Sequence, residues 1–212
     1  MSAGFITAAD LQHQLGGIPL ERIRLVPPPG LATDNDAMQV QDREGRTCEV
    51  IDGVLVEKAM GYYEALIAAA IVYFLEAYLQ TNDLGIVLGP DGLVRISSSQ
   101  SRAPDVTFAS WDKFPNRRLP AAAVPHVIPD LAVEVLSRGN TRAEIERKLD
   151  EYFANGVRAV WVIQPVHETA KIYESRDEPA EIGSEGTLRA PQVLPGFELA
   201  MRALFDHAGR RE

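Results

Sequence analysis

The sequence predicts a mixed α/β fold, with a central sheet flanked by helices and an N-terminal arm in front of it. The predicted elements run in the order hairpin, helix, several strands, helix and two strands, without the strict strand–helix alternation of a doubly wound fold. Residues 130–136 are mostly apolar on both faces, which is typical of a strand in the middle of a sheet. A length of 212 residues with 46% hydrophobic residues suits one large domain with a substantial core.

Residues 1–46 are predicted to form the arm, and not a separate domain. Residues 10–15 are compatible with one or two helical turns, and the run Pro-Pro-Pro-Gly at 27–30 interrupts regular structure. The stretch 32–44 that follows is polar and acidic.

A β-hairpin and a long helix are predicted next. In residues 48–57, apolar residues alternate around Asp52-Gly53, which is a favoured two-residue hairpin turn. Residues 62–79 are apolar on nearly all sides of a helix, so we expect that helix to be buried. No apolar run reaches the length of a membrane span, and we interpret 65–75 as part of this core helix.

The middle of the chain predicts further strands of the sheet. Residues 84–96 contain two short strands around Gly-Pro-Asp-Gly at 89–92, and residues 105–109 form another strand. The segment 111–129 is a Pro-rich, Arg-containing loop, and its length suggests a functional role. The strand 130–136 follows, and alternation places Leu131, Val133 and Val135 on one face and Ala132, Glu134 and Leu136 on the other.

The last third of the chain predicts a helix, two strands and a closing element. Thr141 and Glu144 form a capping box that starts the helix, and Gly156 is expected to end it. Residues 159–163 predict a buried strand, and 170–174 a more exposed one. We expect Leu-Pro-Gly-Phe at 194–197 to end the sheet and 199–205 to form a short closing element.

Composition limits the class of protein and its surroundings. The formal net charge of −9 is unfavourable for long-range attraction to nucleic acid, although it leaves room for a local basic cleft. The N-terminus lacks a basic segment followed by an apolar stretch, so no secretory signal is expected. A single cysteine, Cys48, cannot form an internal disulfide, and a cytoplasmic location fits best.

Three charged residues stand where an apolar core is predicted. Asp105 opens an apolar strand, Glu134 lies in the middle of the next, and Lys148 follows on a helix. A buried carboxylate is costly unless a cation, a proton or hydrogen-bond donors meet it. Only four lysines occur in the chain, and the placement of one here suggests that a compact point charge is needed.

Each of these residues also has an ordinary structural interpretation. Asp105 could cap a turn after Pro104, Glu134 could form a buried salt bridge with an arginine, and the Lys148 head could reach solvent. Glu64 is a fourth candidate, because it points with the core stripe of the helix 62–79. It could equally complement the helix dipole.

Taken together, the carboxylates and the lysine favour a metal site. Carboxylate oxygens are the ligands that Mg²⁺ or Mn²⁺ prefers, and a lysine can lower the pKa of an attacking water or stabilise charge on a phosphate. Other chemistries find no support. The four histidines are scattered, and the sequence lacks a zinc pattern, a Gly-rich phosphate loop and a serine nucleophile elbow.

The sequence resembles the Uma2 family, whose members have the PD-(D/E)XK fold of restriction-endonuclease-like proteins. The likeness runs from about Cys48 to Phe205, and we take 47–207 as the restriction-endonuclease-like domain. The matching motifs are Pro104-Asp105, the acidic strand Pro129 to Ser137, Lys148-Leu149 with Tyr152, Gly156-Val157, Val160-Trp161-Val162-Ile163, and Leu194-Pro195-Gly196-Phe197.

The resemblance implies roles for four residues. Asp105 and Glu134 would be metal ligands, Lys148 the catalytic lysine moved from the strand onto the helix, and Glu64 an acidic metal ligand from the first helix. The chain departs from the family pattern at two positions. Leu136 stands where the strand normally carries its lysine, so activity would depend on Lys148, and Gln164-Pro165 replaces the usual Asp-Pro.

We therefore expect a DNA endonuclease that hydrolyses phosphodiester bonds with Mg²⁺ or Mn²⁺. The alternative is a non-catalytic nucleic-acid-binding or regulatory module on the same fold, and a third hypothesis is a subunit active only as a homodimer or with a partner. Five basic residues are candidates for phosphate contact, although surface cations more often serve solubility. They are Lys113, Arg117, Arg118, Arg138 and Arg142.

Overall fold

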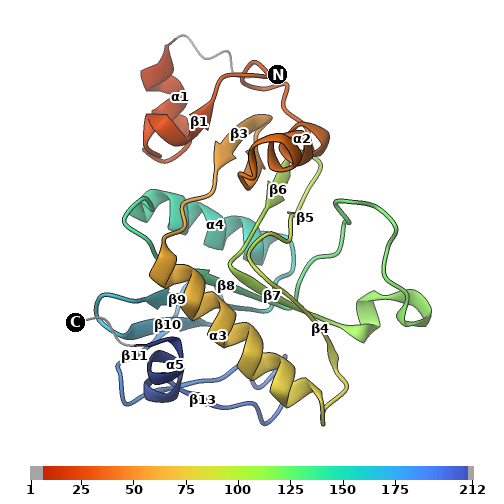
Figure 1. The fold of residues 1–212 in the computed structure, drawn as a ribbon, viewed down its shortest axis with the longest axis vertical. Helices are drawn as coiled ribbons and strands as arrows, with labels where there is room; N and C mark the ends of the chain where they lie inside the picture. Colours follow the sequence, from red (N-terminus) through yellow and green to blue (C-terminus); the bar gives the residue numbers. More distant parts are fainter. Residues whose placement is uncertain (1–6, 210–212) are drawn as a thin grey trace.

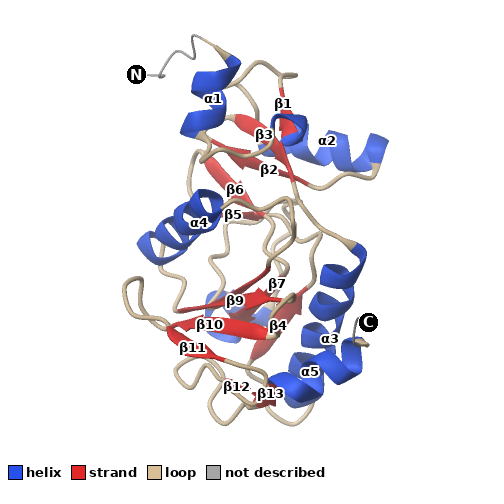
Figure 2. Ribbon diagram, turned by 90° about the vertical axis from the view of Figure 1, so that its left-hand side faces the viewer, coloured by secondary structure: helices blue, strands red, loops and turns tan. Residues whose placement is uncertain are grey.

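The computed structural model describes residues 7–209 and contains two main sheets stacked along the long axis of the molecule (Figures 1 and 2). The smaller sheet has the strand order β1-β3-β2-β6-β5, and the larger has the order β11-β10-β9-β8-β7-β4. Helix α4 (Arg142–Ala154) lies between them in both views. This mixed α/β arrangement confirms the predicted fold class.

The residues before Cys48 build onto the smaller sheet. They form α1 (Ala8–Gln14), the short 3-10 helix η1 (Leu20–Arg22), β1 (Ile23–Arg24) and α2 (Asp34–Glu44). Both α-helices begin at a threonine capping box. The turn expected at 10–15 lies in α1, whereas α2 was not predicted, because its sequence is polar on most sides and gives a weak helical pattern.

The predicted hairpin is confirmed as β2 (Cys48–Ile51) and β3 (Val54–Glu57). Asp52 and Gly53 both have positive φ, 50° and 71°, as this type of tight turn requires. The β2 strand also pairs with β6 (Gln100–Arg102), which pairs with β5 (Val94–Arg95). Strand β6 was not predicted, because three polar residues give no strand alternation.

Helix α3 (Tyr62–Leu79) has the predicted bounds and packs against the larger sheet and α5. Among the described residues, it is the one helix that is long and apolar enough to span a membrane. From the sequence alone, no apolar run of that length was expected. Its apolar stripe belongs to the main hydrophobic core, as expected of a core helix. The expectation that the helix is buried on nearly all sides is wrong, however, because Tyr62 and Tyr73 are exposed.

The larger sheet places the predicted acidic strand near its centre. In the order of the chain, its strands are β4 (Gly85–Leu88), β7 (Val106–Ser110), β8 (Leu131–Val135), β9 (Ala159–Gln164), β10 (Thr169–Tyr173) and β11 (Ala180–Ile182). Strands β8 and β9 are parallel, and every other neighbouring pair is antiparallel. The predicted face alternation of β8 is confirmed, because Leu131 packs in the core under α3 and Ala132 packs under α4.

The end of the chain closes the sheet beside α3. Strands β12 (Thr187–Leu188) and β13 (Leu199–Ala200) pair with each other, and α5 (Met201–Ala208) packs on α3. The loop between β7 and β8 contains only the short 3-10 helices η2 (Trp111–Lys113) and η3 (Pro115–Arg117). Helix α4 begins at the predicted Thr141–Glu144 capping box, and Gly156 follows its end with a φ of 94°.

Candidate active site

Asp105 is placed at the start of β7 by hydrogen bonds to the neighbouring strand β8. Its backbone N–H donates to the Val133 carbonyl oxygen (2.9 Å), and its Oδ2 accepts a hydrogen bond from the Val135 N–H (2.6 Å). The other carboxylate oxygen, Oδ1, is buried and has no hydrogen-bond partner among the described residues. It faces the Lys58 ammonium at 2.9 Å, so charge attraction without a well-aligned hydrogen bond is its main compensation.

Lys58 reaches Asp105 from the segment that follows β3. Its side chain is 7% exposed, and its Nζ donates to the carbonyl oxygens of Pro90 (2.8 Å) and Pro104 (3.2 Å). Sequence reasoning did not assign Lys58 to the site. The scarcity of lysine was a signal that could have drawn attention to it, since Lys58 is one of only four lysines.

Glu134 projects from β8 into the space below α4 and is 4% exposed. Its carboxylate accepts hydrogen bonds from Lys148 Nζ (2.9 Å) and from the Tyr152 hydroxyl (2.5 Å). Burial raises the pKa of Glu134, and charge repulsion from Asp105 raises it further. The attraction of Lys148 opposes both effects, and the pKa nevertheless stays above its ordinary value.

Lys148 lies between the carboxylates of Glu134 and Glu49. Besides Glu134, its Nζ contacts Glu49 on β2 at 3.0 Å. The residue is 3% exposed, so the ordinary expectation that its head reaches solvent is wrong for this chain. Burial alone would lower the pKa of Lys148, but Glu134 and Glu49 outweigh burial and raise it. Lys148 is therefore a charged ammonium at neutral pH.

Glu49 is a buried carboxylate that sequence reasoning missed. It accepts hydrogen bonds from Arg102 Nη1 (2.9 Å) and the Ala103 N–H (3.1 Å), in addition to its contact with Lys148. Burial would raise its pKa, but Lys148 and Arg102 outweigh burial and lower the pKa to about 2. A glutamate in an apolar hairpin strand was the available signal, but only the structure shows that all four residues of β2 are buried.

These side chains surround a cavity of about 10 Å³, roughly the space of one water molecule. Four carboxylates and three cations contribute to its lining, which leaves a formal excess of one negative charge. The lining residues are Arg22, Glu49, Lys58, Ala59, Asp105, Glu134, Asn140, Glu144 and Lys148. The structure thus brings Asp105, Glu134 and Lys148 together, as the sequence predicted.

The donor chemistry of this cavity suits a hard divalent cation held by two carboxylates. Asp105 Oδ1 is a buried oxygen without a donor, and Asp105 and Glu134 are close enough to raise the pKa of Glu134. Within residues 7–209, no group of three acidic, histidine or cysteine side chains is arranged to hold a metal. Mg²⁺, however, is commonly bound by one or two carboxylates plus water and substrate phosphates, so two ligands are sufficient for a fit.

Glu64 does not join this cavity. It is buried in the first turn of α3 and lines an adjacent groove of about 590 Å³. The groove shares three wall residues with the small cavity, namely Arg22, Lys58 and Ala59. The helical stripe correctly predicted that Glu64 is buried, but it could not show which cavity the carboxylate lines.

The five basic residues predicted to contact phosphate separate into two groups. Arg138 lines the groove, and Arg142 is exposed at the start of α4. The other three, Lys113, Arg117 and Arg118, follow the opposite end of β7 from Asp105.

Two members of the second group already have acidic partners. Lys113 pairs with Asp130 (3.3 Å), and Arg117 pairs with Asp83 (2.5 Å) and stacks over Trp111. The second group is therefore not brought to the cavity.

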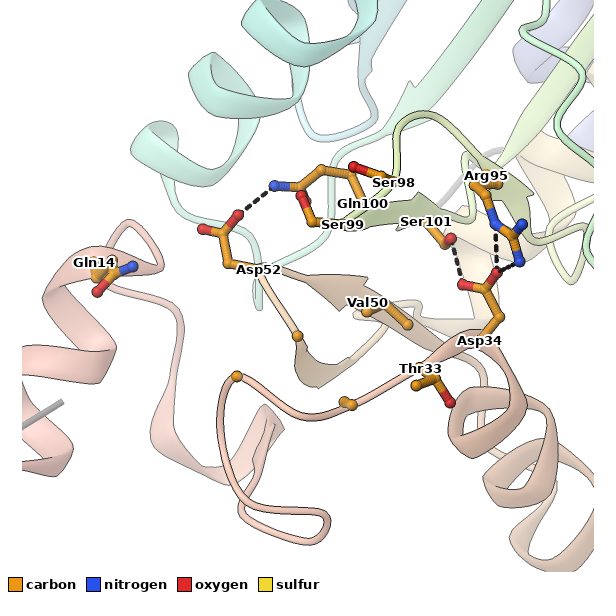
Figure 3. A pocket seen from close by; sticks show the side chains of 13 residues that line it. Gln14, Thr33, Asp34, Val50, Asp52, Arg95, Ser98, Ser99, Gln100 and Ser101 are labelled. Carbon is orange, nitrogen blue, oxygen red and sulfur yellow. Dashed lines mark hydrogen bonds and ion pairs between the residues drawn. The ribbon is translucent and has the colours of Figure 1, made fainter. Parts of the chain in front are cut away.

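A larger polar cavity of about 830 Å³ lies in the smaller sheet (Figure 3). Its charged side chains are paired with their neighbours: Asp34 bonds Arg95 and Ser101, and Asp52 bonds Gln100. Asp52 also pairs with Arg147 on α4 (2.7 Å). These contacts join α2 to β5 and β6, and the hairpin turn to β6 and α4, so the charged groups of this cavity already have partners.

Comparisons with known proteins bear on the family and the fold of the chain. The model of the Uma2 family, described as "Putative restriction endonuclease", matches residues 34–202. The fold is similar to the crystal structure of "a putative nuclease belonging to DUF820" from Anabaena variabilis ATCC 29413, with a TM-score of 0.66 and 17% sequence identity. That match covers 76% of this chain and 91% of the other. No curated protein matches the chain.

Proposed function

The chain belongs to the Uma2 family, and we propose that it is a metal-dependent endonuclease that hydrolyses phosphodiester bonds in DNA. One observation carries the proposal. The buried Asp105 Oδ1, which lacks a hydrogen-bond donor, lies beside Glu134 in a cavity with an excess of negative charge and a buried ammonium. A buried carboxylate with a raised pKa, as in Glu134, next to a charged lysine is common in catalytic sites.

Asp105 and Glu134 are the residues that would hold Mg²⁺ or Mn²⁺. A divalent cation bound there would supply a polarised water and offset negative charge on the scissile phosphate. The Tyr152 hydroxyl and the Lys148 ammonium both donate to Glu134, and so they orient the carboxylate. The Val135 N–H does the same for Asp105.

Lys148 is suited to stabilise charge and not to accept a proton. Its raised pKa keeps the ammonium protonated at neutral pH, so it cannot act as a general base there. An ammonium held in a desolvated site stabilises a developing negative charge more strongly than the same group does in water. We therefore assign to Lys148 the role of stabilising the negative charge that develops on the phosphate oxygens.

The adjacent groove is the proposed path of the nucleic-acid backbone. Arg22, Lys58 and Arg138 contribute three cations to its lining, against the carboxylates Glu57 and Glu64. A phosphate there would be next to the wall of the catalytic cavity. This local set of cations offsets the unfavourable overall charge of −9.

The proposal is tested by incubating the full chain with supercoiled, linear and single-stranded DNA in Mg²⁺ or Mn²⁺, with EDTA controls. Metal-dependent cleavage of one of these substrates supports it, and cleavage of RNA alone would change the substrate class. Absence of cleavage in every combination would overturn the endonuclease assignment.

A non-catalytic nucleic-acid-binding module is the second candidate, and one observation favours it. Asp105 and Glu134 each already have an ammonium partner, Lys58 and Lys148, so the described residues balance much of their own charge without a metal. Saturable DNA binding without cleavage, equal in EDTA and in Mn²⁺, would support this alternative.

A further inference from the structure

The N-terminal segment at residues 7–32 precedes the region that the family model matches, yet it docks on the helix that carries Lys148. Thr141 Oγ1, at the start of α4, donates to the Gly16 carbonyl oxygen (2.7 Å), and Arg147 donates to that of Gln14 (3.2 Å). Gly16 has a φ of 82°, and a Cβ there would lie 3.2 Å from the backbone of α4. This close approach is available to glycine.

An apolar cluster holds the same segment on the hairpin. Leu11, Leu15, Ile18 and Ile23 pack with three hairpin residues, Ile51, Val54 and Val56. Figure 2 shows α1 and β1 beside β3 at the end of the molecule above α4. The segment is therefore an integral part of the described structure, and its docking positions the last residue of η1.

That residue is Arg22, which joins three elements of the site. Its Nε donates to the Glu57 carbonyl oxygen (2.8 Å) at the end of β3, and its Nη1 donates to that of Gly139 (2.7 Å) between β8 and α4. Its two terminal nitrogens bind the Glu144 carboxylate at 3.0 and 2.7 Å in a bidentate pair. Arg22 is 9% exposed, so water competes little for these bonds.

Arg22 also stands in the wall between the catalytic cavity and the groove. Lys58 and Ala59 complete that shared wall, but Arg22 is its one member from the N-terminal segment. A cavity of about 10 Å³ has room for one water and not for a phosphate, whereas the groove of about 590 Å³ has ample room. A phosphate can reach Asp105 and Glu134 only if the wall opens.

We propose that Arg22 is the gate of the catalytic cavity, and that a phosphate group in the groove opens it by taking the guanidinium from Glu144. The guanidinium fork binds carboxylate and phosphate with the same bidentate geometry, so Glu144 occupies the place that a phosphate would take. Arg22 is then a substrate-positioning residue outside the family-matched region. The inference rests on the proposed function for its biological meaning, and its tests below require neither a metal nor catalysis.

The first test measures access to the cavity by reductive methylation of lysines in the full chain. The chain has only four lysines, and Lys148, which lines the cavity and not the groove, can be compared with the internal standards Lys113 and Lys171 in the same sample. Arg22→Ala should increase the rate at Lys148, relative to both standards, by at least about tenfold, because local opening sets the rate of a buried group. Arg24→Ala is the matched control, since Arg24 pairs with Glu44 and Glu57 and lines neither space. An unchanged Lys148 rate in folded Arg22→Ala overturns the gate.

The second test measures binding of inorganic phosphate by phosphorus NMR. Arg22→Ala should weaken phosphate binding about tenfold or more, because a bidentate charged contact is lost. Glu144→Gln should strengthen it, because the competing carboxylate charge is removed, and it should also speed Lys148 methylation. A purely structural role for the pair would change phosphate affinity in the same direction in both variants. That outcome, or no saturable phosphate binding by the wild type, overturns the proposal.

The two sets of tests fail independently. If Arg22→Ala does not fold, Glu144→Gln alone decides, because it keeps the arginine and the shape of the wall. Absence of DNA cleavage with the expected methylation and phosphate results would refute the endonuclease and keep the gate. If the wild type cleaves DNA but the Arg22 variants match it in methylation and phosphate binding, the endonuclease is supported and the gate is refuted.

Discussion

Lys148 on α4 and Glu134 on β8 form a buried ion pair at 2.9 Å, with the two residues 3% and 4% exposed. The pair joins the helix and the central strand of the larger sheet, and Glu49 extends it to the smaller sheet. A buried pair of this kind is seldom a net source of stability, because desolvation offsets most of the attraction. Its position next to Asp105, whose Oδ1 accepts no hydrogen bond, therefore suggests a role in chemistry.

Glu134→Gln is the substitution that should separate metal binding from folding. The glutamine keeps the shape of the side chain and can still accept a hydrogen bond from Tyr152, but it removes the ligand charge. We expect the circular dichroism spectrum to be unchanged and Mn²⁺ binding, measured by isothermal titration, to disappear together with cleavage. Glu181→Gln, at an exposed pair with Lys171, is the control. Wild-type binding in Glu134→Gln would sink the assignment of this ligand.

Lys148→Met should destabilise the fold and reverse its response to pH. Removing the ammonium leaves Glu134 and Glu49 without a shared partner, at a cost of about 3–5 kcal/mol at pH 7. The pKa of Glu134, already above its ordinary value, rises further without the ammonium that opposed it, while Glu49 keeps Arg102 as a partner. Stability lost at neutral pH therefore returns as pH falls and Glu134 takes up a proton. Urea denaturation at pH 5 and pH 7 measures both effects. Lys171→Met should change neither the stability nor its dependence on pH. If the free energy of unfolding of Lys148→Met changed with pH in the same way as that of the wild type, the reasoning would be contradicted.

Glu49→Gln should remove part of the acid sensitivity of the fold. The folded pKa of Glu49 is lowered from 4.5 to about 2, so its stabilisation is present above about pH 4.5 and is lost as pH falls toward 2. The shift corresponds to about 3 kcal/mol. The variant should be less stable than wild type at pH 7, because Arg102 and Lys148 each lose a carboxylate, and its stability should fall less steeply between pH 4.5 and 2. Equal slopes for the two proteins in this window would refute the assignment.

Tyr152→Phe should shift the pH dependence of metal binding. The hydroxyl donates to Glu134 at 2.5 Å and lowers its pKa, so the phenylalanine variant should have a still higher Glu134 pKa. A higher pH is then needed to ionise the ligand, and the midpoint of Mn²⁺ binding against pH should move upward. Loss of the charged hydrogen bond should cost about 1.5–3 kcal/mol of stability. Tyr62→Phe, at an exposed site, serves as the comparison, and a common midpoint for both variants would show that Tyr152 does not act on Glu134.

The sequence was most informative where structure depends on neighbours along the chain. Alternation around Asp52-Gly53 predicted the hairpin, the apolar periodicity of 62–79 predicted α3, and the Thr141–Glu144 box predicted the start of α4. Each of these signals lies within a few turns or one strand pair, and tertiary packing did not override them. The same local logic placed Glu134 on the face of β8 that α4 covers.

The sequence by itself thus determined the fold class, the main elements and three residues of the candidate site, Asp105, Glu134 and Lys148. Only the tertiary structure decided that Lys58, Glu49 and Arg22 meet them and that Glu64 does not. The physical reason is that a buried charge is compensated by whichever opposite charge packing brings near, however distant in the chain. Arg22 and Glu144 are 122 residues apart, and no local pattern encodes such a pair.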